Sequence, residues 1–360
     1  MRIVPTKCIP EDAVLAEPLY TETGMVFLKE GAQLTGRLVE KINQLNIYSV
    51  YIKDRHSTGE IERLVNPQLK QRGHNLVKRI FDAAANTKPD GTPAPLTILD
   101  MMPELSRLME DVIYDMTGLK EKQLEYIDIK NTNSYLYSSA VNVALIAVLI
   151  GWELGLSPDM INELFMGGIF HDIGMAMLPK EILYKKEPLE MEEKRQVLYH
   201  PVKGYDYLRD KSFLSAYVRA ITLGHHEHID GTGYPNRKSG GEIHMLTQII
   251  GIADIYDAMT SDRPYRQAIP ANEALEYIMS VAGKHYSMDI VKAFIKKINP
   301  YPVGSLVKLT DGQTAVVRRV SPEMPLRPHV SIIRKKADGF DYTEVNLMEN
   351  HTLTIAGIHY

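Results

Sequence analysis

One apolar stretch, from Leu136 to Leu154, limits the folds open to this chain more than any other feature. It carries apolar residues on most faces of a helix, and such a helix must be surrounded on all sides by other protein or by lipid. Its longest apolar run, roughly Ala140 to Trp152, is interrupted by Asn142 and is shorter than the ~20 residues that cross a bilayer. We therefore predict a buried central helix with other helices packed around it, and no membrane span.

The composition is that of an ordinary globular protein with more than one domain. The chain has 360 residues, of which 44% are hydrophobic and 24% charged, so two or three domains with substantial cores are expected. The net charge is −4, and there is no global positive field to attract DNA. Cys8 is the only cysteine, which excludes an internal disulfide. Residues 1–10 lack the apolar core of a signal peptide, so we expect a cytoplasmic protein.

Apolar spacing, glycines and prolines divide the chain into four segments. Residues 1–56 are predicted to form a small N-terminal α/β or β-rich domain, and residues 57–118 a helical linker region. Residues 119–300 are predicted to form a helical domain, and residues 301–360 a small C-terminal β segment. The predicted fold class is therefore mostly α, with a helical bundle at the centre and a small domain at each end.

Within the helical domain, the 3.6-residue spacing and the capping residues predict where individual helices lie. The expected helices after the central one are Pro158–Gly174, Glu190–Leu208, Phe213–His226, Met245–Met259, Ala271–Ala282 and Met288–Ile298. After residue 300 the spacing changes to alternation, which is typical of strands. The expected strands are Ser305–Leu309, Ala315–Val320 and Val330–Ile333.

Two adjacent histidines, His225 and His226, form the most unusual pair in the sequence. They begin the run His-His-Glu-His-Ile-Asp-Gly-Thr-Gly-Tyr-Pro, which ends at Pro235. Imidazole is the commonest metal ligand near neutral pH, because its free pKa lies low enough for the neutral form to be present. Glycine and proline prevent a helix from continuing, so the run after the histidines is predicted to be a shaped loop at the mouth of a metal site.

Further candidate ligands precede and follow this pair. Six of the twelve histidines fall between residues 171 and 244, where an even spread would place two or three. His171 and Asp172 are neighbours on one predicted helix, and the two carboxylate oxygens of Asp172 can bridge two ions. His200 and Asp254 lie on later predicted helices, and ligands from several helices often meet inside a bundle.

This ligand set suggests a chemistry. Nitrogen and oxygen ligands without sulfur suit iron, manganese, zinc, nickel or cobalt, and the sequence does not choose among them. Two ions about 3.5–4 Å apart stabilise both the attacking and the leaving oxygen of a phosphoryl displacement, and they lower the pKa of a water held between them. Such a centre hydrolyses phosphodiesters without a serine or cysteine nucleophile.

The order of the motifs resembles one known family. In chain order they are His171-Asp172, His200-Pro201, the run from His225 to Pro235, and Ala253-Asp254-x-x-Asp257-Ala-Met-Thr-Ser-Asp-Arg-Pro-Tyr-Arg266. Across about residues 130–300 the chain resembles the HD-GYP domain, a branch of the HD superfamily that contains cyclic di-GMP phosphodiesterases. The resemblance implies an HD-type helical bundle over residues 119–300, two divalent ions, iron or manganese, and cyclic di-GMP as the molecule bound.

The same resemblance implies how the metal ligands are shared between the two ions. One ion would be held by His171, Asp172 and Asp254. The other would be held by Asp172, His200, His225 and His226, so that Asp172 is the bridge and a catalytic residue.

The resemblance also implies contacts with substrate. Arg263 and Arg266 correspond to basic residues that meet the phosphates, and forked guanidinium donors match phosphate oxygens well. Tyr234 shapes the recognition loop. Asp257 lies one turn after Asp254 on the same helix face, where it is expected to orient a ligand or the bridging water as a second catalytic carboxylate.

The chain departs from the family pattern at several positions. Ser139 stands where the family usually has a histidine ligand, so the first ion would keep only three protein ligands. Met175 replaces the lysine of the family's His-Asp-x-Gly-Lys run, and a lost charge-assisted hydrogen bond costs about 1.5–3 kcal/mol. Lys185 or Lys186 is a candidate replacement for that charge. Tyr135 stands where some members have a glutamate, so no third ion is expected.

Three functional hypotheses follow. The first is a metal-dependent phosphodiesterase that hydrolyses cyclic di-GMP to pGpG or GMP through a binuclear metal site. The second is a catalytically weak or inactive signalling protein that binds metal or cyclic di-GMP and acts through a partner. The third is a general HD-type phosphohydrolase of other phosphoesters, against which the Gly-Tyr-Pro loop argues. A homodimer, or a protein partner that binds the N-terminal domain, is the expected assembly.

Overall fold

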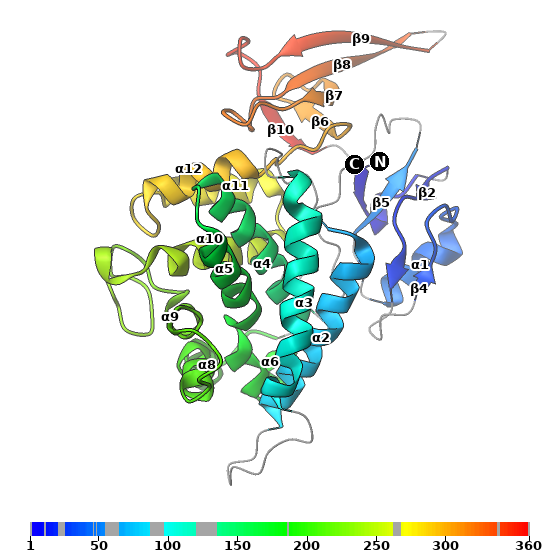
Figure 1. Ribbon diagram of the computed structural model, residues 1–360. Coiled ribbons are helices and arrows are strands. Elements are labelled where there is room, and N and C mark those ends of the chain that lie inside the picture. The colour runs from blue at the N-terminus through cyan, green and yellow to red at the C-terminus, as the bar shows by residue number, and fades with distance from the viewer. Residues whose placement is uncertain are drawn as a thin grey trace.

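The computed structural model describes residues 2–10, 12–20, 26–45, 47, 49–54, 65–86, 97–119, 135–185, 187–261, 268–336 and 339–358. Figure 1 shows a central helical domain, with the small N-terminal domain beside it and a twisted C-terminal sheet above it. The predicted fold class is therefore confirmed: the protein is mostly α, with a β-containing domain at each end.

The helical domain is assembled around helix α4, Tyr135–Glu153. Fifteen of its residues are buried, because other helices cover it on every face. In length and hydropathy α4 resembles a membrane span, but 83% of that stretch is buried inside the domain. That degree of burial within protein is what the sequence required of a central core helix.

The helices around α4 carry the site and the rest of the core. They are α2 Pro67–Ala85, α3 Ile98–Met116, α5 Pro158–Phe170, α6 Lys180–Leu183, α7 Met191–Leu198, α8 His200–Arg209, α9 Ala216–Gly224, α10 Met245–Thr260, α11 Ala271–Ser280 and α12 Met288–Lys297. A 3₁₀ helix, Ile173–Met177, links α5 to α6. Helices α2 and α3 share one hydrophobic core with α4, so the segment before the central helix packs as part of the bundle.

The local sequence explains where key helices begin. The Ser157 hydroxyl accepts a hydrogen bond from the Met160 N–H, and Pro158 occupies the first turn of α5, where its missing N–H costs nothing. The ring of His244 accepts the N–H of Leu246 in the same way at the start of α10. The single helix predicted over Glu190–Leu208 is wrong, because the chain forms two helices, α7 and α8, that meet at Tyr199. Pro201 favours this break because it fits only the first turn of a new helix.

The two terminal domains are small sheets with their own cores. The N-terminal domain has a three-stranded sheet in the order β1-β5-β2, formed by β1 Arg2–Pro5, β2 Val14–Leu15 and β5 Ser49–Lys53. A separate pair of strands is formed by β3 Leu19–Tyr20 and β4 Val26–Leu28. The helix α1 Gly36–Gln44 packs against the same hydrophobic core as the sheet. The C-terminal sheet has the order β10-β6-β7-β8-β9, with strands β6 Leu306–Leu309, β7 Thr314–Arg319, β8 His329–Lys336, β9 Gly339–Asn346 and β10 Ile355–Ile358. All its pairings are antiparallel, which suits short connections between consecutive strands.

Candidate metal centre

Two groups of ligand-type side chains meet where the ends of three helices face the middle of a fourth. The first group is His171, Asp172 and Asp254; the second is Asp172, His200, His225 and His226. His171 and Asp172 follow the last residue of α5, His200 begins α8, the histidine pair follows α9, and Asp254 lies within α10. Asp172 belongs to both groups, so the structure brings together all six side chains that the sequence proposed as metal ligands.

The first group directs one ring nitrogen of His171 toward its two carboxylates. The Nδ1–H of His171 donates to the Gly168 carbonyl at 2.7 Å, which leaves Nε2 as the unprotonated nitrogen of the neutral ring. That Nε2 is buried and has no hydrogen-bond partner in the described part of the chain. It lies 3.6 Å from Oδ2 of Asp172 and 3.7 Å from Oδ1 of Asp254. Two carboxylates facing this nitrogen favour positive charge between them, which either a proton on Nε2 or a bound metal ion supplies.

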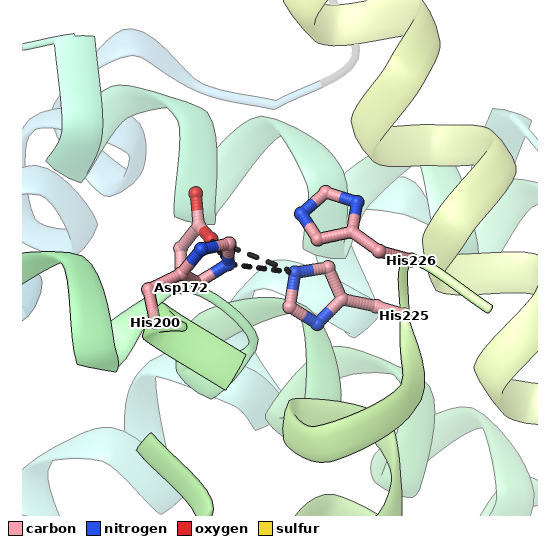
Figure 2. Close-up of side chains that lie close together, drawn as sticks. All are labelled: Asp172, His200, His225 and His226. Carbon is pink, nitrogen blue, oxygen red and sulfur yellow. Dashed lines mark hydrogen bonds and ion pairs between the residues drawn. The ribbon is translucent and has the colours of Figure 1, made fainter. Parts of the chain in front are cut away.

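In the second group, two imidazoles direct their Nε2 atoms into the site. His200 Nδ1–H donates to the Val197 carbonyl at 2.7 Å, and His225 Nδ1–H donates to the Thr222 carbonyl at 3.1 Å. Their Nε2 atoms are then only 3.3 Å apart, and that of His200 is 2.9 Å from Oδ1 of Asp172. Figure 2 shows these rings, with His226, gathered around the Asp172 carboxylate. Two facing lone pairs repel each other unless a proton or a metal ion lies between them, so the donor set fits a metal ion.

The electrostatics of the site agree with this donor set. Burial opposes ionisation of Asp172, but the imidazoles of His171 and His200 outweigh it and hold the pKa of Asp172 well below its usual range. Burial and the neighbouring rings lower the pKa values of His225 and His226. Burial also opposes protonation of His171, yet the carboxylates of Asp172 and Asp254 raise its pKa to about 9. The carboxylates therefore stay charged and attract positive charge, which is a proton on His171 when no metal is bound, so a metal ion there must displace that proton.

Asp257 faces helix α4 rather than either ligand group. Its Oδ2 accepts the Ser139 hydroxyl at 2.5 Å and its Oδ1 accepts the Asn142 amide at 3.1 Å, and all three side chains are buried. Ser139 at the family's histidine position is therefore occupied by this contact. The role of Asp257 in orienting a ligand or water remains a prediction.

The remaining predicted site residues fall into two groups. Tyr234 stacks on the ring of His226, with ring centroids 4.6 Å apart and planes 25° from parallel. Arg263 and Arg266 lie outside the described residues, as does Lys186. Lys185 is engaged elsewhere, because its Nζ lies 2.7 Å from each carboxylate oxygen of Glu193.

Three features of the site were not predicted from the sequence. Gly168 and Gly174 are required because a Cβ on either would lie within 2.4 Å of the backbone of a neighbouring helix. Glu227 is buried beneath the loop that follows the histidine pair. The sequence placed Gly174 at the end of a predicted helix, but only the packed helices show which backbone each glycine contacts.

Comparison with known proteins identifies the class. Residues 122–290 match the family model described as HD domain, and residues 306–359 match the one described as KOW domain associated with HD domain. Residues 122–290 thus form an HD domain, and the resemblance seen in the sequence is confirmed by this match and by the cyclic di-GMP phosphodiesterases to which the chain is similar.

Individual relatives refine this picture. A protein of Pseudomonas aeruginosa named cyclic di-GMP phosphodiesterase PA4108 is 33% identical over 227 residues, which are 63% of this chain and 55% of that protein. A 3'3'-cGAMP-specific phosphodiesterase of Vibrio cholerae is 34% identical over 149 residues, covering 41% of this chain and 34% of that protein. The chain thus spans little more than half of the first of these relatives. Among solved structures, the HD-GYP protein Bd1817 of Bdellovibrio bacteriovorus shares the fold, with a TM-score of 0.53, 14% identity, and coverage of 81% of this chain and 97% of that one.

Proposed function

We propose that this protein is a cytoplasmic, metal-dependent phosphodiesterase that hydrolyses cyclic di-GMP to pGpG or GMP. The observation that carries the proposal is the pair of ligand groups that share Asp172, each with an imidazole Nε2 directed at a carboxylate oxygen. The names of the relatives support cyclic di-GMP as the substrate. Iron and manganese are the expected metals, because both accept mixed imidazole and carboxylate ligands.

The chain's own residues supply three parts of this activity. Backbone carbonyls fix the tautomers of His171, His200 and His225, so their Nε2 atoms are preorganised toward the site. Two ions bound there would neutralise charge on a phosphodiester and make a water more acidic. Tyr234, and the arginines at positions 263 and 266, are proposed to hold the dinucleotide.

The proposal is tested by turnover of the full chain loaded with iron or manganese, with cyclic di-GMP, 3'3'-cGAMP and bis(p-nitrophenyl) phosphate as substrates. Linear pGpG should appear first and fastest from cyclic di-GMP. Equal rates on all three substrates would instead support a general phosphohydrolase. No product from any substrate, in an assay where an intact HD-GYP enzyme is active, would contradict the proposal.

A second candidate function is a catalytically weak or inactive binding protein that signals through a partner, at the N-terminal domain or in a homodimer. It is favoured by two observations: Ser139 is bonded to Asp257 where the family pattern expects a metal ligand, and Lys185 is paired with Glu193 and cannot replace the missing lysine at Met175. This candidate predicts that cyclic di-GMP binds to the protein with little or no turnover.

The double substitution Ser139→His and Met175→Lys should distinguish the two functions. The restored ammonium alone should raise turnover about ten- to a hundredfold, because a charge-assisted contact is worth about 1.5–3 kcal/mol, and the restored imidazole should raise metal content. Ser139→Ala with Met175→Leu is the matched control, since it changes the same positions without adding a ligand or a charge. Unchanged turnover and unchanged metal content in the double variant would show that these two departures do not limit the enzyme.

A further inference from the structure

Glu227 is a buried carboxylate that belongs to neither ligand group among the described residues. Its residue is 2% exposed, and both of its oxygens are engaged. Oε1 accepts the backbone N–H of Asn236 at 2.7 Å, and Oε2 accepts the backbone N–H of Lys238 at 2.9 Å. A carboxylate whose two oxygens both accept hydrogen bonds from backbone N–H groups has a fixed orientation. Hydrogen bonds to a charged acceptor are among the stronger ones in proteins.

The two N–H groups flank a residue in an uncommon conformation. Arg237, between them, has φ +54°, in the left-handed region that favours glycine. A non-glycine residue holds this conformation only when its surroundings enforce it. The paired hydrogen bonds from Asn236 and Lys238 to one buried carboxylate provide that enforcement.

The other end of the same loop lies directly on the metal centre. Gly233 packs so closely that a Cβ would lie 2.4 Å from the backbone nitrogen of His228 and 2.5 Å from Cα of Glu227. The next residue, Tyr234, donates its backbone N–H to the His226 carbonyl at 3.1 Å and stacks its ring on the His226 ring. Hydrogen bonds therefore join the two ends of the segment from Glu227 to Lys238, with the Glu227 carboxylate buried inside it. The half-buried Tyr234 lies beside His226, a proposed metal ligand.

We propose that Glu227 is a positioning residue for substrate recognition. By holding the backbone at Asn236 and Lys238, its carboxylate fixes the loop that places Tyr234 on His226, at the edge where a cyclic dinucleotide would enter. Glu227 then governs how well substrate binds, and it contributes little to metal binding or to the chemical step. This inference rests on the proposed phosphodiesterase function for its kinetic part alone.

The test compares Glu227→Gln with Glu242→Gln in the full chain. A glutamine has one acceptor oxygen and turns an NH₂ group toward the second N–H, so one of the two hydrogen bonds is lost. Glu242 is the matched control, because its carboxylate also accepts from this loop, at the backbone N–H of Ser239, but on the exposed side. Hydrogen exchange, metal content, KM and kcat are measured for both variants.

In Glu227→Gln the amides of Asn236 and Lys238 should exchange at least about tenfold faster, and KM should rise about tenfold, as expected for a charge-assisted contact of ~1.5 kcal/mol. Metal content should stay at the wild-type value and kcat within about threefold of it. Glu242→Gln should change none of these. Unchanged exchange at both amides, or loss of metal in the Glu227 variant, would overturn the proposal.

Two further outcomes are also decisive. If Glu227→Gln unfolds, Glu227→Asp, which keeps the charge but shortens the reach, should give intermediate exchange and an intermediate KM, and wild-type values for both would overturn the proposal. If the wild-type protein hydrolyses no cyclic dinucleotide, the proposed function fails, but hydrogen exchange at Asn236 and Lys238 still decides whether Glu227 holds the loop.

Discussion

Asp172→Asn should reduce the metal content of the protein from two ions to fewer than one and lower its turnover of cyclic di-GMP by about a thousandfold or more. Asp172 is the one side chain common to both ligand groups. Its oxygens lie 2.9 Å from Nε2 of His200 and 3.6 Å from Nε2 of His171. Asparagine keeps the shape of this side chain but removes the charge and one of the two acceptor oxygens, so the side chain can no longer bridge two ions and holds either one only weakly.

Elemental analysis and turnover of the same preparation measure both effects. Asp206→Asn is the matched control, because Asp206 is an exposed carboxylate on α8, the helix that carries His200. The control should keep full metal content and activity. An Asp172→Asn protein that still bound two ions would mean that the groups do not share this carboxylate, and the account of a joint centre would be wrong.

Gly174→Ala should destabilise the protein by about 3 kcal/mol and should lower turnover about a hundredfold, although Gly174 holds no ligand. A Cβ at this position would lie 2.0 Å from the carbonyl oxygen of His200 and 2.7 Å from the backbone nitrogen of Gly204. Both contacts are with backbone, so no side chain can rotate away and α8 must move. Helix α8 begins with His200, and its displacement by about 1 Å separates that ligand from Asp172.

Urea denaturation and turnover test this prediction together. Gly241→Ala is the control, because a Cβ there meets nothing within 4 Å, and it should change stability by less than about 0.5 kcal/mol. If Gly174→Ala kept both its denaturation midpoint and its activity, the close approach of α8 to the turn after α5 would not be what positions His200.

Much of the helical domain was predictable because its signals are local. The apolar stretch around Val143 required a buried helix, and Ser157-Pro158 marked the start of α5 correctly. The strands β9 and β10 were missed, since β9 alternates around charged residues such as Asp341 and Glu344, and β10 is short and contains Gly357. Strand β9 forms by pairing with β8, and β10 by pairing with β6. Such pairing depends on tertiary contacts, so the local sequence pattern does not predict it.

The candidate site shows the same division between local and tertiary information. Residue type and spacing were enough to select the six ligand-type side chains, because imidazoles and carboxylates have few other reasons to cluster in a bundle core. Spacing was not enough to show that Asp257 faces Ser139, or that Lys185 is paired with Glu193. Each of these contacts joins separate elements, so it depends on how the chain packs.

Anomalous diffraction from crystals of the full chain, loaded separately with iron and with manganese, tests the central claim most directly. The account predicts two anomalous peaks on either side of the Asp172 carboxylate: one among Asp172, His200, His225 and His226, and one among His171, Asp172 and Asp254. Data from metal-saturated protein with no peak beside Asp172, or with metal bound only elsewhere, would contradict it.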